Sequence, residues 1–276
     1  MLLKDQVAIV TGGGGGIGED ICLCLAREGA QVVVSDINKE LAQKVSAKVK
    51  ESGQESLAVK TDVRFEAQCN NLVAMTLNEF NRLDILVCAA GTSGVNWMTA
   101  PVDPAAVENI PVEAWDMTLD VNLKGVFLCN RAVISYFKQQ KRGKIINVSS
   151  IGGRRGGGGL PPYSASKAGV INLTQSIAMQ VAPFNINANT ICPGLVWTPM
   201  WAEGISFTTG KARWEKLQAK GVSPEEAFMQ MVHAGTPLKR PQTPEDMGNL
   251  VVFLASDLAC EITGQAINVD GGALLN

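Results

Sequence analysis

The sequence is poor in the residues that build metal sites and disulfide frameworks. It has one histidine, His233, and its seven cysteines form no Cys-x-x-Cys pair. A zinc site usually takes four Cys or His ligands, so this composition argues against a metal centre. Most of the cysteines lie within apolar stretches, which favours buried free thiols over disulfides. We therefore expect a cytoplasmic protein without a metal.

Charge and long apolar runs are also scarce. Lys and Arg number 24 against 26 Asp and Glu, and no basic run is interleaved with aromatics. This balance gives no sign of binding to nucleic acid or to a membrane surface. No apolar stretch approaches the length that spans a bilayer. We expect no signal peptide, because Met1–Asp5 is too short an apolar start and runs into the first predicted strand.

Apolar strand-like and helix-like segments alternate along the 276 residues, 46% of which are hydrophobic. This alternation predicts an α/β fold, a doubly wound parallel sheet of Rossmann type, in one domain spanning 1–276. Ligands of such sheets bind at the carboxyl ends of the strands. The predicted strands are 7–11, 31–36, 56–61, 84–88, 144–149, 186–192 and 265–269, and the predicted helices are 17–29, 38–52, 65–81, 113–140, 163–182 and 244–256.

A glycine-rich turn follows the first predicted strand. Thr11–Gly18 contains five consecutive glycines and leads into a helix-like stretch. Glycines let the backbone approach a pyrophosphate, and the helix N-terminus offers free N–H groups. A flexible linker is the alternative, but the flanking strand and helix oppose it. A Walker A loop is excluded, because no Gly-Lys-Ser/Thr follows.

The second predicted strand ends on Asp36, eighteen residues after Gly18. An acid here can accept both hydroxyls of an adenosine ribose and would repel a 2′-phosphate. No Arg or Lys lies in the glycine turn or directly after Asp36. The expected cofactor is therefore NAD. Capping of the helix that begins near Asn38 is a second role that Asp36 could have at the same time.

Tyr163 and Lys167 stand four residues apart in Tyr-Ser-Ala-Ser-Lys. On a helix they share one face, and an ammonium beside a phenol favours the phenolate. Such a pair can move a proton on or off an alcohol near neutral pH. In isolation the pattern is weak, because Tyr and Lys meet at this spacing on many amphipathic helices.

Taken together, these motifs resemble the short-chain dehydrogenase/reductase family from about Asp5 to Gly272. The family's Thr-Gly-x-x-x-Gly-x-Gly is Thr11, Gly12, Gly16 and Gly18, and its Tyr-x-x-x-Lys is Tyr163 and Lys167. The catalytic Ser thirteen residues before the Tyr is Ser150, and the structural Asn is Asn122. The resemblance implies a catalytic set of Asn122, Ser150, Tyr163 and Lys167. It also implies that cofactor contacts come from Gly12, Gly14, Gly16, Ile17, Gly18, Asp36, Ile37, Asp62, Val63, Ala89, Ala90, Gly91, Tyr163, Lys167, Pro193, Gly194, Val196 and Thr198.

One motif departs from the family. Cys88-Ala-Ala-Gly91 stands where relatives often carry Asn-Asn-Ala-Gly. Any hydrogen bonds from those two Asn side chains are lost, whereas backbone contacts to the cofactor do not need them. We interpret the change as a tolerated variant.

Three longer segments are expected to shape the substrate side. They are Thr92–Pro111, the glycine-rich Gly152–Pro162, and Pro199–Pro241, which predicts a helical lid with a helix running from Ser223 toward His233. Arg154 and Arg155 either bind an anionic substrate group or face solvent or a second subunit. The aromatic residues of the lid region either line an apolar pocket or only pack the lid on the body. The candidate substrate-lining residues are Gly152, Arg154, Trp197, Met200 and Trp201; Phe207 and Trp214 belong to the same aromatic group.

The resemblance implies hydride transfer between NAD(H) and a secondary alcohol or ketone. Tyr163 would exchange the alcohol proton, Ser150 would hold the oxygen, and Lys167 would bind the ribose and lower the Tyr163 pKa. Asn122 would help to carry protons to solvent. The aromatic lid favours an apolar or cyclic substrate body. Alternatives are a sugar or polyol dehydrogenase, a 3-oxoacyl thioester reductase and, in a different class, a non-catalytic NAD(H)-binding sensor. The family also implies a homotetramer or homodimer formed through the helices near 113–140 and 163–182.

Overall fold

A computed structural model describes residues 1–94, 106–156, 160–201 and 211–275, with only the backbone of 211–214. Seven parallel strands form one sheet in the order β3-β2-β1-β4-β5-β6-β7. The chain runs outward from β1 to β3 and then crosses back to β4. The strands are β1 (Val7–Thr11), β2 (Gln31–Asp36), β3 (Ser56–Lys60), β4 (Ile85–Cys88), β5 (Gly143–Val148), β6 (Ile186–Pro193) and β7 (Ala266–Val269). The predicted doubly wound parallel fold is confirmed.

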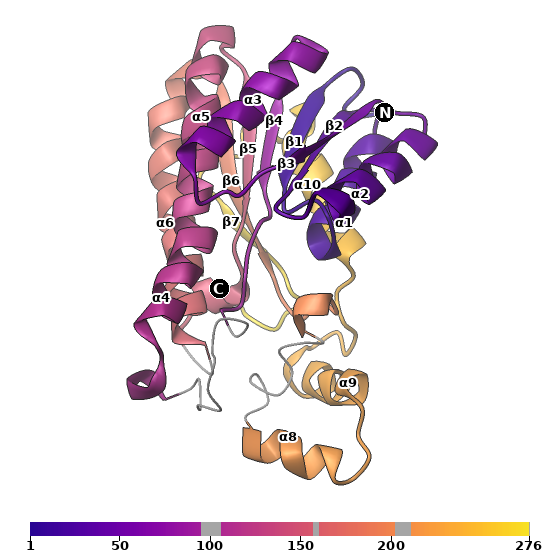
Figure 1. The fold of residues 1–276 in the computed structure, drawn as a ribbon, viewed down its shortest axis with the longest axis vertical. Helices are drawn as coiled ribbons and strands as arrows, with labels where there is room; N and C mark the ends of the chain where they lie inside the picture. Colours follow the sequence, from indigo (N-terminus) through magenta and orange to yellow (C-terminus); the bar gives the residue numbers. More distant parts are fainter. Residues whose placement is uncertain (95–105, 157–159, 202–210, 276) are drawn as a thin grey trace.

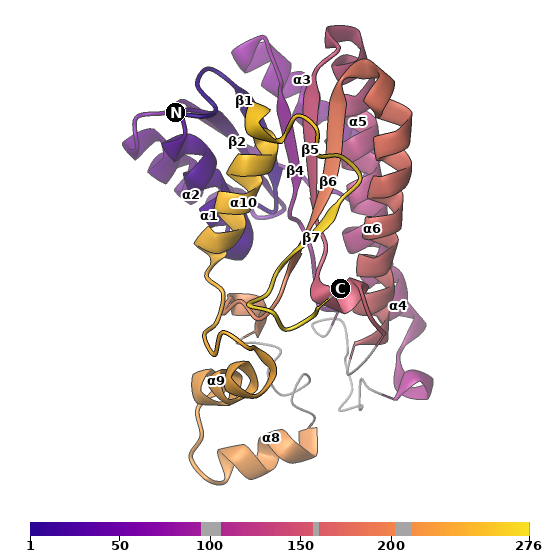
Figure 2. The same cartoon turned by 180° about the vertical axis from the view of Figure 1, so that it is seen from behind.

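Helices cover both faces of the sheet (Figures 1 and 2). Strand β1 shows why, because Ala8 and Val10 join the core on one face whereas Val7 and Ile9 join the core on the other. Side chains of a strand alternate between the two faces of the sheet, so a strand that is apolar throughout needs helices packed on both faces. The first face is covered by α1 (Gly16–Arg27), α2 (Lys39–Glu51) and α10 (Pro244–Ala255), and the second by α3 (Glu66–Phe80), α5 (Gly125–Gln140) and α6 (Pro161–Val181).

Helices α1 and α10 come from opposite ends of the sequence and pack side by side (Figure 2). Arg27 Nη1 lies 2.6 Å from Glu245 Oε1, and Arg27 Nη2 donates to Asn249 Oδ1 over 2.7 Å. The first core therefore closes only when the C-terminal helix is in place.

The helix expected over 113–140 is interrupted. It consists of α4 (Val112–Leu119), a π-helical turn over Asp120–Lys124, and α5. Single π turns inside helices occur frequently at functional sites, and this one contains Asn122.

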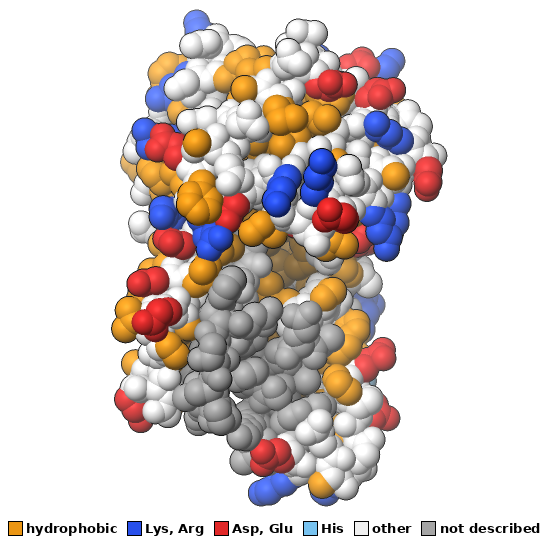
Figure 3. Space-filling model, in the orientation of Figure 1, with side chains coloured by type: hydrophobic (Ala, Val, Ile, Leu, Met, Phe, Trp, Pro, Cys, Tyr) orange, Lys and Arg blue, Asp and Glu red, His pale blue; other side chains and the backbone are white. Residues whose placement is uncertain are grey.

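Beyond the carboxyl ends of the strands lie α8 (Lys211–Gln218) and α9 (Pro224–Gly235) (Figure 1). The predicted helix from Ser223 toward His233 is confirmed, and Ser223 and Glu226 form a reciprocal capping box. The surface is hollowed where the sheet meets this region, with apolar side chains in the hollow (Figure 3). Among the described residues, no helix combines the length and apolar character needed to cross a membrane.

Candidate active site

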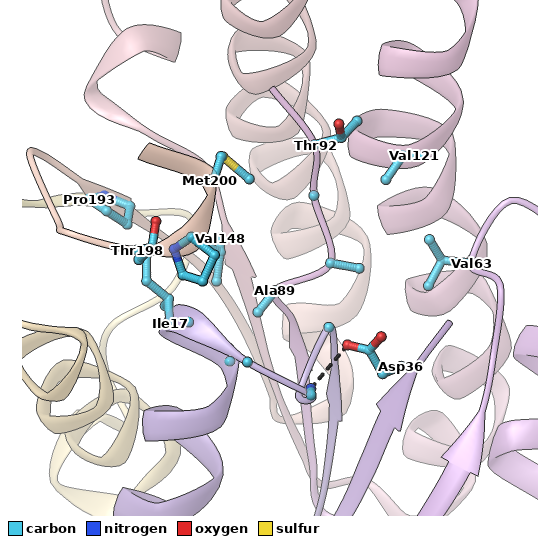
Figure 4. A pocket seen from close by; sticks show the side chains of 18 of the residues that line it. Ile17, Asp36, Val63, Ala89, Thr92, Val121, Val148, Pro193, Thr198 and Met200 are labelled. Carbon is cyan, nitrogen blue, oxygen red and sulfur yellow. Dashed lines mark hydrogen bonds between the residues drawn. The ribbon is translucent and has the colours of Figure 1, made fainter. Parts of the chain in front are cut away.

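A cavity of about 490 Å³ lies at the carboxyl ends of the strands. It runs from Asp36 at the end of β2 to Thr198 beyond β6 (Figure 4). Residues that are distant in sequence meet here because parallel strands end at the same edge of the sheet. Every residue predicted to hold the cofactor lines this cavity, namely Gly12, Gly14, Gly16, Ile17, Gly18, Asp36, Ile37, Asp62, Val63, Ala89, Ala90, Gly91, Tyr163, Lys167, Pro193, Gly194, Val196 and Thr198.

The glycine turn between β1 and α1 needs its glycines for two reasons. Gly12 and Gly16 have positive φ angles of 69° and 54°, a region that side chains with a Cβ rarely occupy. A Cβ at Gly18 would lie 2.0 Å from the carbonyl oxygen of Gly12, so the helix could not pack on the turn. The N-terminus of α1 therefore opens onto the cavity with its backbone N–H groups, an arrangement that suits a bound phosphate.

Asp36 is fixed in position by two backbone donors. Its Oδ2 accepts a hydrogen bond from Gly14 N over 3.0 Å (Figure 4), and its Oδ1 accepts one from Asn38 N over 2.9 Å. The cap of α2 itself comes from Asn38, whose side chain accepts from Leu41 N. Asp36 thus links the glycine turn to the start of α2 and also faces the cavity.

The next acid along the cavity, Asp62, is paired with Arg64. The Arg64 guanidinium donates to both carboxylate oxygens, with Nε 2.9 Å from Oδ1. This hydrogen bonding holds the pKa of Asp62 below its usual value. Arg64 also lines the cavity, but its charge is directed at Asp62.

Tyr163, Ser150 and Lys167 meet on the opposite side of the cavity. Tyr163 and Lys167 project from α6, and Ser150 follows β5 directly. The Ser150 hydroxyl lies within hydrogen-bonding reach of the Tyr163 phenol, and its Oγ accepts from Gly152 N over 3.0 Å. Lys167 Nζ donates to Val148 O over 2.9 Å and lies 5.6 Å from the centre of the Tyr163 ring. The three predicted side chains therefore share one corner of the cavity.

Burial controls the proton affinities of this corner. Burial raises the pKa of Tyr163, and the hydrogen bond with Ser150 offsets only part of that effect. Burial also lowers the pKa of Lys167 to about 8. The expected lowering of the Tyr163 pKa by Lys167 is not seen here, because burial is the largest cause of both shifts and disfavours both charged forms.

Asn122 lies behind the cavity and not in its wall. Its Oδ1 accepts from Thr92 N over 2.8 Å, while its Nδ2 donates to Thr92 O and to Ser166 Oγ. Ser166 Oγ in turn donates to Tyr163 O over 2.7 Å. Asn122 is fully buried and connects the segment after β4 to the start of α6. In this structure its side chain is a positioning group.

Cys88, where relatives often carry the first Asn of their motif, is buried, and its Sγ accepts from Asn130 Nδ2 over 3.5 Å. The backbone of the segment keeps its course, with Ala89 N donating to Thr11 O over 3.0 Å. Ala89, Ala90 and Gly91 all remain in the cavity wall.

The candidate substrate-lining residues divide into two groups. Met200 and Trp201 line the cavity, as predicted. Trp197 does not, because its ring packs on Phe228 of α9, with 5.0 Å between centroids. The lid aromatics thus serve both purposes, since Trp201 lines the cavity and also packs 5.4 Å from Phe228.

Gly152 and Arg154 also lie outside the cavity and border a separate surface depression. The Arg154 guanidinium donates to the carbonyl of Ala266 on β7 and lies near the Cys192 thiol. A substrate anion in the cavity would not meet it there. Phe207 and the Trp214 side chain lie outside the described residues.

Several wall residues are missing from the prediction. Thr61 and Arg64 flank the predicted Asp62–Val63 pair, so adjacency could have found them. Thr92, Val121, Ser149 and Pro199 each adjoin a predicted site residue in the same way, and Val148 lies two residues before Ser150. Leu41 reaches the cavity from the first turn of α2 and belongs to no motif.

Comparison with known proteins agrees with this geometry. A family model described as enoyl-(acyl carrier protein) reductase matches residues 12–273. The chain is 34% identical to the cyclopentanol dehydrogenase of Comamonas sp. (strain NCIMB 9872) over 99% of both chains. It is 35% identical to the 3-oxoacyl-[acyl-carrier-protein] reductase of Synechocystis sp. over 99% of this chain and 98% of that one.

A solved structure with the same fold is the crystal structure of levodione reductase. It superposes with a TM-score of 0.87 at 30% identity and covers 98% of both chains. The matched relatives span this chain almost completely and are oxidoreductases. With its glycine turn, Ser150, Tyr163 and Lys167 in one cavity, the chain belongs to the short-chain dehydrogenase/reductase family.

Proposed function

We propose that the protein transfers a hydride between NAD(H) and a secondary alcohol or ketone with an apolar or cyclic body. The observation that carries this proposal is the single cavity that joins the Asp36 carboxylate to Ser150, Tyr163 and Lys167. A dinucleotide-binding end and a proton-transfer end in one cavity are the two parts that an alcohol dehydrogenase requires.

The residues of the wall fit a dinucleotide without a 2′-phosphate. The glycine turn and the N-terminus of α1 would hold the pyrophosphate, and Asp36 would accept the adenosine ribose hydroxyls. Arg64 is the cation of the described wall at this end, and its guanidinium already neutralises Asp62. The Asp36 charge therefore favours NAD over NADP.

When bound, NAD⁺ supplies the hydride acceptor. Tyr163 takes the alcohol proton in oxidation and returns it in reduction. Ser150 hydrogen-bonds the same oxygen and keeps it beside the phenol. Lys167 would bind the nicotinamide ribose with the N–H groups that Val148 O does not occupy. Its ammonium would oppose part of the rise that burial causes in the pKa of Tyr163.

The described substrate end of the wall is apolar. Met200 and Trp201 form part of it, and an apolar ring would bury surface there that a polyol would have to desolvate at a cost. The cyclopentanol and levodione named for two relatives are cyclic compounds. A cyclic secondary alcohol is therefore the substrate class that we propose.

A second candidate is reduction of a 3-oxoacyl thioester, which the Synechocystis relative favours. The two functions share the proton-transfer residues and differ in the substrate. They are separated by assaying a cyclic ketone and a 3-oxoacyl thioester side by side with NADH and with NADPH.

The direct test is NADH formation from NAD⁺ and NADP⁺ with cyclic, aromatic, steroid, polyol and sugar alcohols. We expect turnover with NAD⁺ on the cyclic apolar alcohols and a loss of about 100-fold or more in Tyr163→Phe with unchanged NADH affinity. Wild-type turnover in Tyr163→Phe would contradict the assignment. Tight NADH binding without turnover on any substrate would favour a non-catalytic sensor.

We also propose a cytoplasmic homotetramer or homodimer. Free cysteines, all but Cys260 buried, suit a reducing compartment. Helices α4, α5 and α6 expose large apolar side chains, including Trp115, Phe127 and Met179, which is 82% exposed. An apolar surface of this kind suits a second copy of the chain.

A further inference from the structure

Ser150 and Arg154 are the two ends of one short turn. A single 3₁₀ turn spans Ile151–Gly153, with Ser150 as its N-cap and Arg154 as its C-cap. Three hydrogen bonds close it, from Gly152 N to Ser150 Oγ, from Gly153 N to Ser150 O and from Arg154 N to Ile151 O. Because the turn is so short, a displacement of Arg154 also moves Ser150.

One side of the turn is packed flush on α6. A Cβ at Gly153 would lie 2.5 Å from the carbonyl carbon of Lys167, so only glycine allows this approach. Ser149 Oγ donates to Lys167 O over 2.7 Å and ties the residue before Ser150 to the same point. Contact with α6 holds the turn at Ser149 and Gly153, and a second attachment follows at Arg154.

Arg154 supplies that second attachment. Its Nη1 donates to the carbonyl of Ala266, which pairs with Thr190 at the edge of the sheet. Its guanidinium also lies close enough to the Cys192 thiol to oppose part of the rise that burial causes in the pKa of that thiol. Cys192 is fully buried and directly precedes Pro193 and Gly194 of the cavity wall.

We propose that Arg154 is a positioning residue, which ties the Ser150 turn to β7 at the edge of the sheet and so holds the Ser150 hydroxyl beside the Tyr163 phenol. The inference rests on the proposed function, since it assigns Arg154 a part in the same proton transfer. The planar guanidinium presents several donors in a fixed fork and can reach a carbonyl and a thiol at once. The sequence after Arg155 is Gly156–Gly159, which has no side chain to anchor the turn from that direction.

The neighbouring arginine provides a matched control. Arg155 is exposed and borders the same surface depression as Arg154. We expect Arg154→Ala to lower kcat by between about 10-fold and about 100-fold, the range for a misplaced reacting group. The KM for NAD⁺ should change less than about twofold, because Arg154 is expected to affect the rate of the chemical step and not the binding of the cofactor. Arg154→Lys should restore part of the rate, because an ammonium can replace one contact of the fork. Arg155→Ala should retain wild-type turnover.

A double-mutant cycle separates positioning from a general structural effect. If Arg154 acts through Ser150, then Arg154→Ala should cost little more once Ser150→Ala has removed the hydroxyl. An additive loss in the double variant would overturn the proposal. So would equal losses in Arg154→Ala and Arg155→Ala, since these would indicate a general charge effect on an anionic substrate.

Amide hydrogen exchange tests the anchor without any turnover. Exchange at Gly152 and Gly153 should be faster in Arg154→Ala than in wild type or Arg155→Ala, because both amides bond to Ser150. Unchanged exchange would overturn the proposal whatever the enzyme does. Absence of turnover in the wild type would instead count against the proposed function, and exchange would still decide the role of Arg154.

Discussion

Tyr163 and Lys167 are a phenol and an ammonium held in one desolvated corner. Burial raises the pKa of the first and lowers that of the second to about 8. A neutral phenol is ready to donate a proton to a ketone oxygen. The reverse reaction requires the phenolate, which this corner disfavours. At the scale of single residues, the two directions should therefore respond differently to pH.

We expect kcat/KM for alcohol oxidation to increase from pH 7 to pH 10, by at most about tenfold per pH unit and less steeply above pH 8, where Lys167 loses its charge. The raised pKa of Tyr163 keeps the phenolate a minor form over this range. Reduction of the matching ketone should stay nearly constant over the same range. Steady-state assays of both directions in one buffer series give the profiles. Oxidation that is independent of pH between 7 and 10 would show that the phenol ionises below pH 7.

Lys167 should be a site where activity is kept at the expense of stability. Its pKa falls from 10.5 to about 8 on burial, which corresponds to about 3 kcal/mol of lost stability at pH 7. The folded state binds this proton less tightly than the unfolded state, so wild-type stability should increase between pH 8 and pH 10.5. Lys167→Met should lose turnover, melt at a higher temperature at pH 7, and lose this advantage by pH 10.

Thermal melts of wild type and Lys167→Met at pH 7, 8.5 and 10 test this expectation. Lys144→Met is a useful control, because Lys144 is also buried with a lowered pKa but lies far from the cavity. It should gain stability without losing turnover. A Lys167→Met variant that melts lower at every pH would contradict the argument.

Residues in motifs could be predicted from the sequence, and residues placed by tertiary contacts could not. Gly18 and Asp36 owe their positions to a local strand, turn and helix, so spacing was enough. Arg154 belongs to no motif and turns to a carbonyl 112 residues away. The Lys167 pKa was likewise beyond prediction, since desolvation depends on every neighbour that excludes water.

At the scale of elements, α9 stands apart from the two cores of the sheet. Phe228 and Val232 are buried in a small cluster of their own with Trp197 and Trp201. A helix with its own small cluster can open without unfolding the body. The cavity wall at Trp201 therefore depends on how well α9 is formed.

Two capping boxes allow a matched comparison. Ser223→Ala and Thr243→Ala each remove a cap, from α9 and α10 respectively, at a cost of about 1 kcal/mol. We expect Ser223→Ala to speed proteolysis and hydrogen exchange within 211–235 about fivefold with little change in the melting temperature. Thr243→Ala should lower the melting temperature and leave exchange in α9 unchanged. Equal changes in melting temperature would show that α9 unfolds only with the body.

The helix predicted over 113–140 was located correctly, but its interruption could not be predicted from the sequence pattern. Apolar periodicity could locate a helix there, but a π turn adds one residue to a turn without changing composition. What favours the π turn is the pairing of Asn122 with Thr92 and Ser166, and these contacts exist only in the folded chain.

At the scale of the whole molecule, the exposed apolar residues of α4 to α6 bear on assembly. Phe127 on α5 is 43% exposed and Met75 on α3 is 38% exposed, so they form a matched pair. We expect sedimentation velocity to show a tetramer or dimer for the wild type and for Met75→Glu. Phe127→Glu should shift the protein toward smaller species, because a carboxylate in an apolar interface is costly to desolvate. A monomeric wild type would contradict this arrangement.

The contact between α1 and α10 has a consequence for protein synthesis. Both helices cover the same face of the sheet, but the ribosome makes them more than 200 residues apart. Until α10 emerges, apolar side chains of the nascent strands β1 and β2 are covered only by α1 and α2 on this face. Exposed surface of this kind makes incomplete chains prone to aggregate. Chains that terminate before Pro244 should therefore be clients of chaperones and proteases rather than partly active fragments.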